Sequence, residues 1–110
     1  MKKRELLDIY TFLANGVKIG ALANASTRSA FISFFRGIKR IADPITKELN
    51  DALVPPLGDA SEETRKQIMD EEVTETLPKI NEGALLEAIA ESKIDAPVNI
   101  ILDVFDQFFE

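Results

Sequence analysis

Carboxylates are the side chains of this sequence whose spacing comes closest to a reactive or metal-binding arrangement. They form two groups, which are Asp70, Glu71, Glu72 and Glu75, and the pair Asp103 and Asp106. Neighbouring carboxylates can share a proton or bind Mg²⁺ or Ca²⁺. Neither group is expected to be buried, and the pattern of a calcium-binding loop is missing. We therefore expect two solvated acidic surfaces and no metal site.

The residue types that most often perform catalysis are missing from the chain. It contains no histidine and no cysteine. This removes the usual general base near neutral pH, the commonest ligands of transition metals and every Ser-His or Cys-His nucleophile. The cluster Ser26-Thr27-Ser29 lacks a base and is typical of helix capping. We expect neither an enzyme nor a cofactor.

A second polar group is basic and lies on the helix predicted over residues 27–53. Its members on the flank away from the apolar seam are Arg28, Arg36, Lys39, Arg40 and Lys47. Arg28, Arg36, Lys39 and Arg40 could bind the phosphates of nucleic acid. A solvated face, or one docked on acidic residues, is favoured because the chain carries a net charge of −6 and no tryptophan. Nucleic-acid binding is therefore our alternative function.

The elements that position these groups belong to a mainly helical chain. Its 110 residues, 45% hydrophobic and 29% charged, predict one globular domain over 1–110. Only nine apolar or polar uncharged residues separate Asp8 from Lys18, too few to span a bilayer, and the charges exclude a secretory signal. We expect a cytoplasmic protein without a membrane contact.

The longest predicted element is a central helix over about 27–53. Its apolar seam alternates spacings of four and three residues through Phe31, Phe35, Ile38, Ala42, Ile45, Leu49 and Ala52, with Phe34 and Ile41 beside it. Pro44 interrupts the seam, but its phase continues, so we expect one kinked helix; a new helix capped by Asp43 is the alternative. The seam is expected to pack against the first and last helices of the chain, and a self-associating coiled coil is the other interpretation.

Four shorter helices and one extended segment complete the prediction. A first helix over Lys3–Asn15 ends at Gly16 in a left-handed turn, and Ser26 or Thr27 caps the central helix. Pro55, Pro56 and Gly58 end the central helix. Later helices are expected from Ser61 to about Glu72, from Asn81 to about Ser92, and after Asp95 as the cap of the last helix, with Ala96 and Pro97 in its first turn. Residues 73–80 are expected to be extended, with at most one edge strand.

Charge is divided unevenly between the two halves of the chain. Residues 1–50 carry nine Lys/Arg and four Asp/Glu, a net of +5, whereas residues 51–110 carry four and fifteen, a net of −11. This division predicts a basic helix docked on the acidic half of its own chain, or copies associated head to tail.

Three segments resemble a group of small uncharacterised phage and prophage proteins. They are the opening Lys3–Leu13 helix, Ala42-Asp43-Pro44-Ile45 in the central helix, and Leu85-Leu86-Glu87-Ala88-Ile89. The resemblance implies an accessory role in phage assembly or host takeover, in the host cytoplasm or the virion, through binding to protein. It transfers no catalytic residue.

The function we expect is therefore a protein–protein interaction or assembly module that associates with itself or with another protein. The apolar stripes of the central and last helices supply its predicted surface. That surface consists of Phe31, Phe35, Ile38, Phe105, Phe108 and Phe109.

Overall fold

The computed structural model describes the backbone of residues 1–51 and 58–110, and the side chains of these except 58–61. The described residues form five α-helices and no strand, as the sequence predicts. The helices are α1 (Lys3–Gly16), α2 (Ala25–Asp51), α3 (Gly58–Asp70), α4 (Glu82–Glu91) and α5 (Val98–Phe105). Two short 3₁₀ turns, η1 (Ile19–Ala21) and η2 (Asp106–Phe108), follow α1 and α5.

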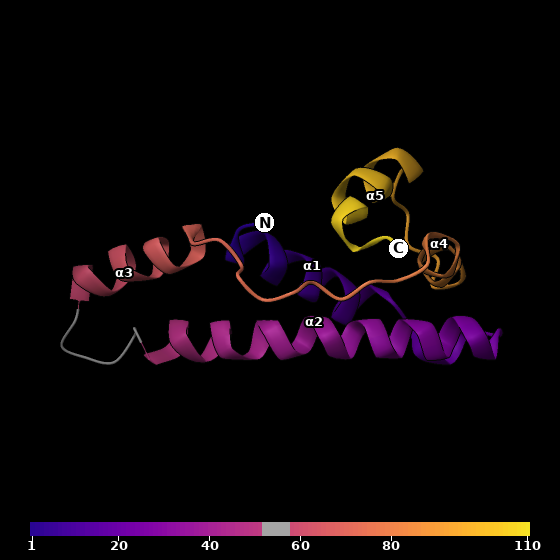
Figure 1. Cartoon of the computed structure of the whole chain (residues 1–110), viewed down its shortest axis with the longest axis horizontal. Coiled ribbons are helices and arrows are strands. Elements are labelled where there is room, and N and C mark those ends of the chain that lie inside the picture. Colours follow the sequence, from indigo (N-terminus) through magenta and orange to yellow (C-terminus); the bar gives the residue numbers. More distant parts are fainter. Residues whose placement is uncertain (52–57) are drawn as a thin grey trace.

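Helix α2 is the base on which the other elements lie. Figure 1 shows α2 along the full length of an elongated molecule, with α1 and α3 above one part and α4 at the other end. The described chain measures 50 × 24 × 24 Å. Helix α5 lies on the far side of α1 from α2 in this view, so it forms an upper layer (Figure 1).

Pro44 lies inside α2 and does not divide it. One helix was predicted in preference to two, and this is confirmed, but the ribbon shows no marked bend in the view of Figure 1. Pro44 and Arg40 are both on the exposed side of the helix. The Arg40 carbonyl, which loses its usual donor to the proline, can therefore be hydrated.

The buried side chains of α2 extend over a wider face than the predicted seam. Phe31, Ile38, Ala42, Ile45 and Leu49 are buried as expected, but Phe34 and Ile41 are buried equally well. Phe35 is only half-buried, in a stack with Tyr10 of α1 at 5.4 Å between ring centroids. The wider face lets α2 pack against α1 on one side and against α4 and η2 on the other. The predicted packing of the seam within the chain is confirmed for the first helix, but α4 and η2 take the place that was expected for the last helix. Ala52 lies outside the described residues.

Three predicted helix ends are wrong. The side chain of Asn24, not Ser26 or Thr27, caps α2: its Oδ1 accepts from the backbone N–H groups of Ser26 at 2.8 Å and Thr27 at 3.3 Å. Helix α1 includes Gly16 and ends at Val17 in extended backbone, without a left-handed turn. Helix α5 follows Pro97, and no Asp95 cap forms.

The start of the third helix also differs from the prediction. Helix α3 begins at Gly58, so Gly58 starts a helix where it was expected to end one, and Ser61 lies inside the helix instead of capping it. The predicted stop at Pro55 and Pro56 falls outside the described residues. The fourth helix, by contrast, starts where it was predicted: Asn81 is the N-cap of α4, and its side chain accepts from the N–H of Ala84 at 3.2 Å.

Residues 73–80 are extended, as predicted, and cross the molecule between α3 and α4 (Figure 1). Both ends of this segment pair with the termini of the described chain. The Val73 N–H donates to the Met1 carbonyl at 2.8 Å, and the Ile80 N–H donates to the Phe108 carbonyl at 2.8 Å. These contacts are isolated bridges, so the edge strand that was allowed for does not form among the described residues.

Candidate interaction surface

The apolar residues predicted as an interaction surface mostly lie inside the chain. Phe31, Ile38, Phe105 and Phe108 are at most 2% exposed. Phe34 and Phe108 pack edge to face with 5.5 Å between ring centroids, which joins α2 to η2. Phe35 and Phe109 are half-buried. The prediction is corrected for Phe31, Ile38, Phe105 and Phe108, because these four side chains belong to the core.

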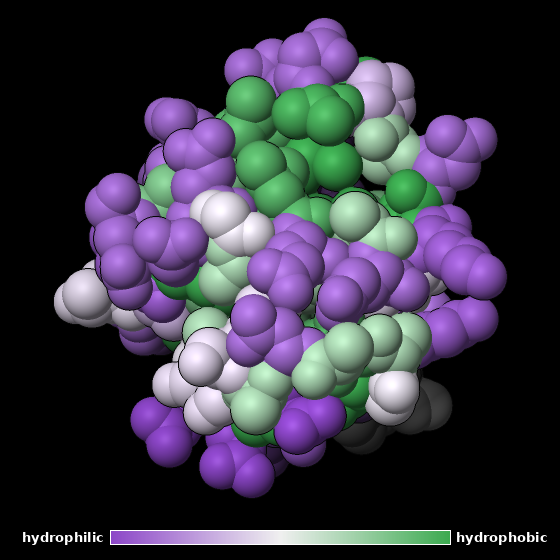
Figure 2. Space-filling model, turned by 90° about the vertical axis from the view of Figure 1, so that its right-hand side faces the viewer, coloured by the Kyte–Doolittle hydropathy of each residue, from purple (hydrophilic) through white to green (hydrophobic). Residues whose placement is uncertain are grey.

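The exposed apolar side chains lie instead on the outer side of α5. Val98 is 58% exposed, Ile100 51% and Val104 45%. Among the described residues, Ile19 at 42% is the other large apolar side chain with this degree of exposure. Figure 2 shows hydrophobic side chains gathered in the upper part of the molecule, at the height of α5, with hydrophilic residues around them. Clustered exposure of this kind is typical of a contact surface.

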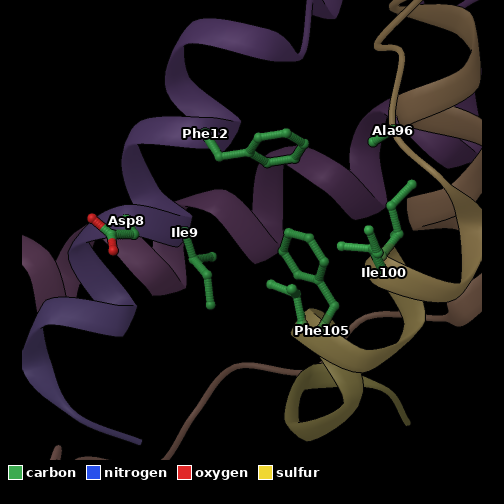
Figure 3. Close-up of a pocket in the computed structure, with 8 residues that line it drawn as sticks. Asp8, Ile9, Phe12, Ala96, Ile100 and Phe105 are labelled. Atoms are coloured by element: carbon green, nitrogen blue, oxygen red, sulfur yellow. The ribbon is translucent and has the colours of Figure 1, made fainter.

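An apolar groove runs between α5 and α1 and continues this surface. Its volume is about 230 Å³, and its lining comes from Asp8, Ile9 and Phe12 of α1 and from Ala96, Ile100, Ile101, Val104 and Phe105. The rings of Phe12 and Phe105 lie 6.1 Å apart across it. Figure 3 shows Ile9, Phe12, Ile100 and Phe105 directed toward one another, with the Asp8 carboxylate turned away at the edge. We call these lining residues the α1/α5 groove.

One edge of the α1/α5 groove is acidic. A neighbouring depression shares Asp8, Ile9 and Val104 with the groove and is also lined by Glu5 and Asp103. Neither Asp8 nor Asp103 forms an ion pair with the described part of the chain. The Met1 ammonium, which also lines this depression, pairs with Glu72 instead, so the edge carries carboxylates without an ion pair among the described residues.

Three carboxylates of the other predicted acidic cluster, Asp70, Glu71 and Glu72, pair with the beginning of the chain. Asp70 pairs with Arg4, and Glu71 lies 3.6 Å from the Lys3 ammonium, which is also 3.6 Å from Glu48. The basic first half of the chain thus docks on its acidic half, but through α1 and not through the basic face of α2. Within residues 1–51 and 58–110 no group of three or more potential metal ligands converges.

Contacts within the chain engage some residues of the predicted basic face of α2 and leave others without a partner among the described residues. The Arg28 guanidinium donates to the Leu22 carbonyl at 3.1 Å, which secures the turn before α2. Lys39 lies 4.0 Å from Asp43, one turn along the helix. Arg36 and Arg40 line a shallow polar depression with Ser29, Ser33 and Ile32, and form no ion pair with the described residues. Two of the four predicted anion-binding residues are thus brought together and left accessible.

One feature of the sequence indicates that α5 has exposed apolar residues. The segment Val98–Leu102 is apolar at four of five positions, so the helix is apolar on more than one face. The predicted interaction surface consisted instead of the phenylalanines on the inner face of α5 and η2. Val98 and Ile100 are exposed because of the rotation of α5 about its own axis relative to α1. Apolar periodicity alone does not define this rotation.

Comparison with protein-family models, with curated proteins and with solved structures finds no match to this chain. No helix in the described part of the chain combines the length and the hydropathy that crossing a membrane requires. The function is therefore argued from the geometry of the groove.

Proposed function

We propose that this chain is a non-enzymatic protein-binding module whose contact surface is the α1/α5 groove. The observation that carries the proposal is the exposure of Ile100 (51%) and Val104 (45%) on the wall of a groove lined almost wholly by apolar side chains. Full burial of one such side chain stabilises by about 1.5–3 kcal/mol, so covering the exposed part of these two contributes about 1–3 kcal/mol. The covering polypeptide is a second copy of this chain or another protein.

Site-specific cross-linking tests this proposal. A photoreactive amino acid is placed at Ile100 in one variant and, as a control, at Thr46 on the exposed side of α2 in another. We expect a discrete adduct with one polypeptide at Ile100, none at Thr46, and loss of the adduct when Val104 is also changed to Asn. Only diffuse or absent adducts at Ile100 would contradict the proposal.

The second candidate function is binding of nucleic acid through α2. It is supported by Arg36 and Arg40, which lie one turn apart in a polar depression with Ser29 and Ser33. Each phosphate contact adds to the salt dependence of such binding. The candidate predicts retention of DNA or RNA at low salt that the double variant Arg36→Glu/Arg40→Glu abolishes. The absence of any retention at low salt would eliminate it.

The biological setting we propose rests on the resemblance to phage and prophage proteins. It implies an accessory protein that acts in the host cytoplasm or in the virion. Capsid, tail or replication genes beside its gene would support this setting, and a neighbourhood without phage genes would contradict it.

A further inference from the structure

The charges at the α1/α5 groove identify the kind of partner that fits it. The groove and the depression beside it are lined by three carboxylates, Glu5, Asp8 and Asp103, and by no lysine or arginine. Met1 also lines the depression, but its ammonium pairs with Glu72 at 2.9 Å. From Ile94 to the end of the chain there are four carboxylates and no basic residue. A ligand that covers the apolar side chains must therefore place its own flank beside negative charge.

The shape of the groove indicates a helical ligand. Its walls are two helices, and α5 with eight residues is about 12 Å long, which corresponds to two turns of helix. A helix lying in such a groove inserts apolar side chains spaced i, i+3 or i+4, and i+7. Resting on the proposed function, we infer that the occupant of the α1/α5 groove is a basic amphipathic helix of another protein, with an apolar stripe flanked by Lys or Arg.

A symmetric pair of this chain fits the groove poorly. A two-fold interface brings the same patch of both copies together. Asp8 and Asp103 of one copy would then lie in the same interface as those of the other, and like charges in an interface repel.

A head-to-tail pair of this chain also fits poorly. Its basic surface is the α2 face with Ser29, Ser33, Arg36 and Arg40, where the apolar contribution is the half-buried Ile32. This face can balance the charge of the groove but cannot fill it. Among the described residues this face supplies no apolar stripe, which favours a different chain as the occupant.

The test measures binding of two synthetic helices to the full chain by fluorescence anisotropy. Both helices carry leucines at i, i+3, i+4 and i+7; one has lysines beside this stripe and the other has glutamates at the same positions. We expect the lysine helix to bind about tenfold more tightly or better, since several exposed charge pairs change sign together. The preference should decrease as salt is raised toward physiological ionic strength.

Two variants of the chain assign the binding to the groove. Ile100→Asn should abolish it, because Ile100 is half exposed on the groove wall and its replacement leaves the core intact; circular dichroism verifies the fold. Asp8→Lys/Asp103→Lys should reverse the preference toward the glutamate helix. The matched control Asp51→Lys/Glu75→Lys adds the same charge at exposed positions outside the groove and should leave the preference unchanged.

The outcomes separate this inference from the proposed function. Equal binding of the two helices overturns the inference alone. Self-association also overturns the inference alone, if sedimentation detects it and Ile100→Asn or Arg36→Glu/Arg40→Glu removes it. A chain that stays monomeric, binds neither helix and gives no cross-link at Ile100 overturns both.

Discussion

Gly37, in the middle of α2, lies directly against Pro78 of the extended segment. A Cβ atom at position 37 would be 2.6 Å from the Cβ of Pro78 and 3.1 Å from its Cγ. Real Cβ contacts are wider than this, so the backbones can approach so closely only where α2 lacks a side chain. The extended segment 73–80 is thereby seated on α2 between its two terminal bridges.

The change Gly37→Ala should therefore destabilise the chain, although alanine is the better helix former. Alanine gains about 1 kcal/mol in helix propensity, but overpacking at a tight contact costs about 1–3 kcal/mol, and here it displaces a proline ring and the backbone that carries it. We expect a net loss of up to about 2 kcal/mol in the free energy of unfolding, measured by urea denaturation.

Gly20→Ala is the matched control for this prediction. Nothing lies within 4 Å of a Cβ atom at position 20, and the backbone there is not left-handed. This variant should be neutral or more stable by about 0.4–1 kcal/mol, because alanine restricts the unfolded chain. Equal effects of both substitutions would show that the approach of Pro78 to α2 is looser than described.

The cap of α2 gives a second prediction, since Asn24 accepts from the first free N–H groups of the helix. Asn24→Ala should cost about 1 kcal/mol of stability, whereas Asn24→Ser or Asn24→Asp should retain most of it. Ser26→Ala, at the residue that the sequence suggested as the cap, should be close to neutral. Chemical denaturation of the four variants measures these differences; a larger loss from Ser26→Ala than from Asn24→Ala would reverse the assignment.

A left-handed residue after α4 gives a third prediction. Lys93 has φ 58°, and the Ile94 N–H donates back to the Ile89 carbonyl at 3.3 Å, as in a Schellman turn. Such a position favours glycine, which has no Cβ to crowd the carbonyl. Lys93→Gly should raise the free energy of unfolding by about 0.5–1 kcal/mol, visible as a higher thermal midpoint. Lys18→Gly, at an exposed residue with φ −105°, should not stabilise the chain.

The helices could be predicted from the sequence because their apolar periodicity is strong. The start of α4 at Asn81 could be predicted because Asn81 directly precedes such an apolar run. The cap of α2 was missed because Asn24, Ser26 and Thr27 are all good capping residues within one turn. Which of them caps depends on the path of the preceding chain, where Arg28 holds the Leu22 carbonyl.

The proposed contact surface, the α1/α5 groove, could not be predicted from apolar periodicity. An apolar stripe such as that of Phe105 and Phe108 does not reveal whether its partner is in the same chain. Here Phe34 of α2, seventy-odd residues earlier in the sequence, covers Phe108, and this directs Ile100 and Val104 outward. The apolar α1/α5 groove therefore follows from tertiary packing, and its acidic edge from the meeting of Asp8 with Asp103.

The final prediction separates the core of α5 and η2 from its outer surface. Phe108 is completely buried, packs edge to face on Phe34, and its carbonyl accepts from the Ile80 N–H. Phe108→Ala should cost about 3–5 kcal/mol, the range for removal of a buried aromatic ring. Ile100→Ala removes a side chain that is 51% exposed and should cost less than about 1.5 kcal/mol.

Denaturation of these two variants side by side tests how α5 is rolled on α1. If Ile100→Ala were the more damaging change, Ile100 would belong to the core and the groove would lose one of its walls. If Phe108→Ala is the more damaging, as we expect, the stability of the chain is supplied by the inner face. Substitutions on the outer face should then change the stability of the chain little, while they change binding to the proposed groove.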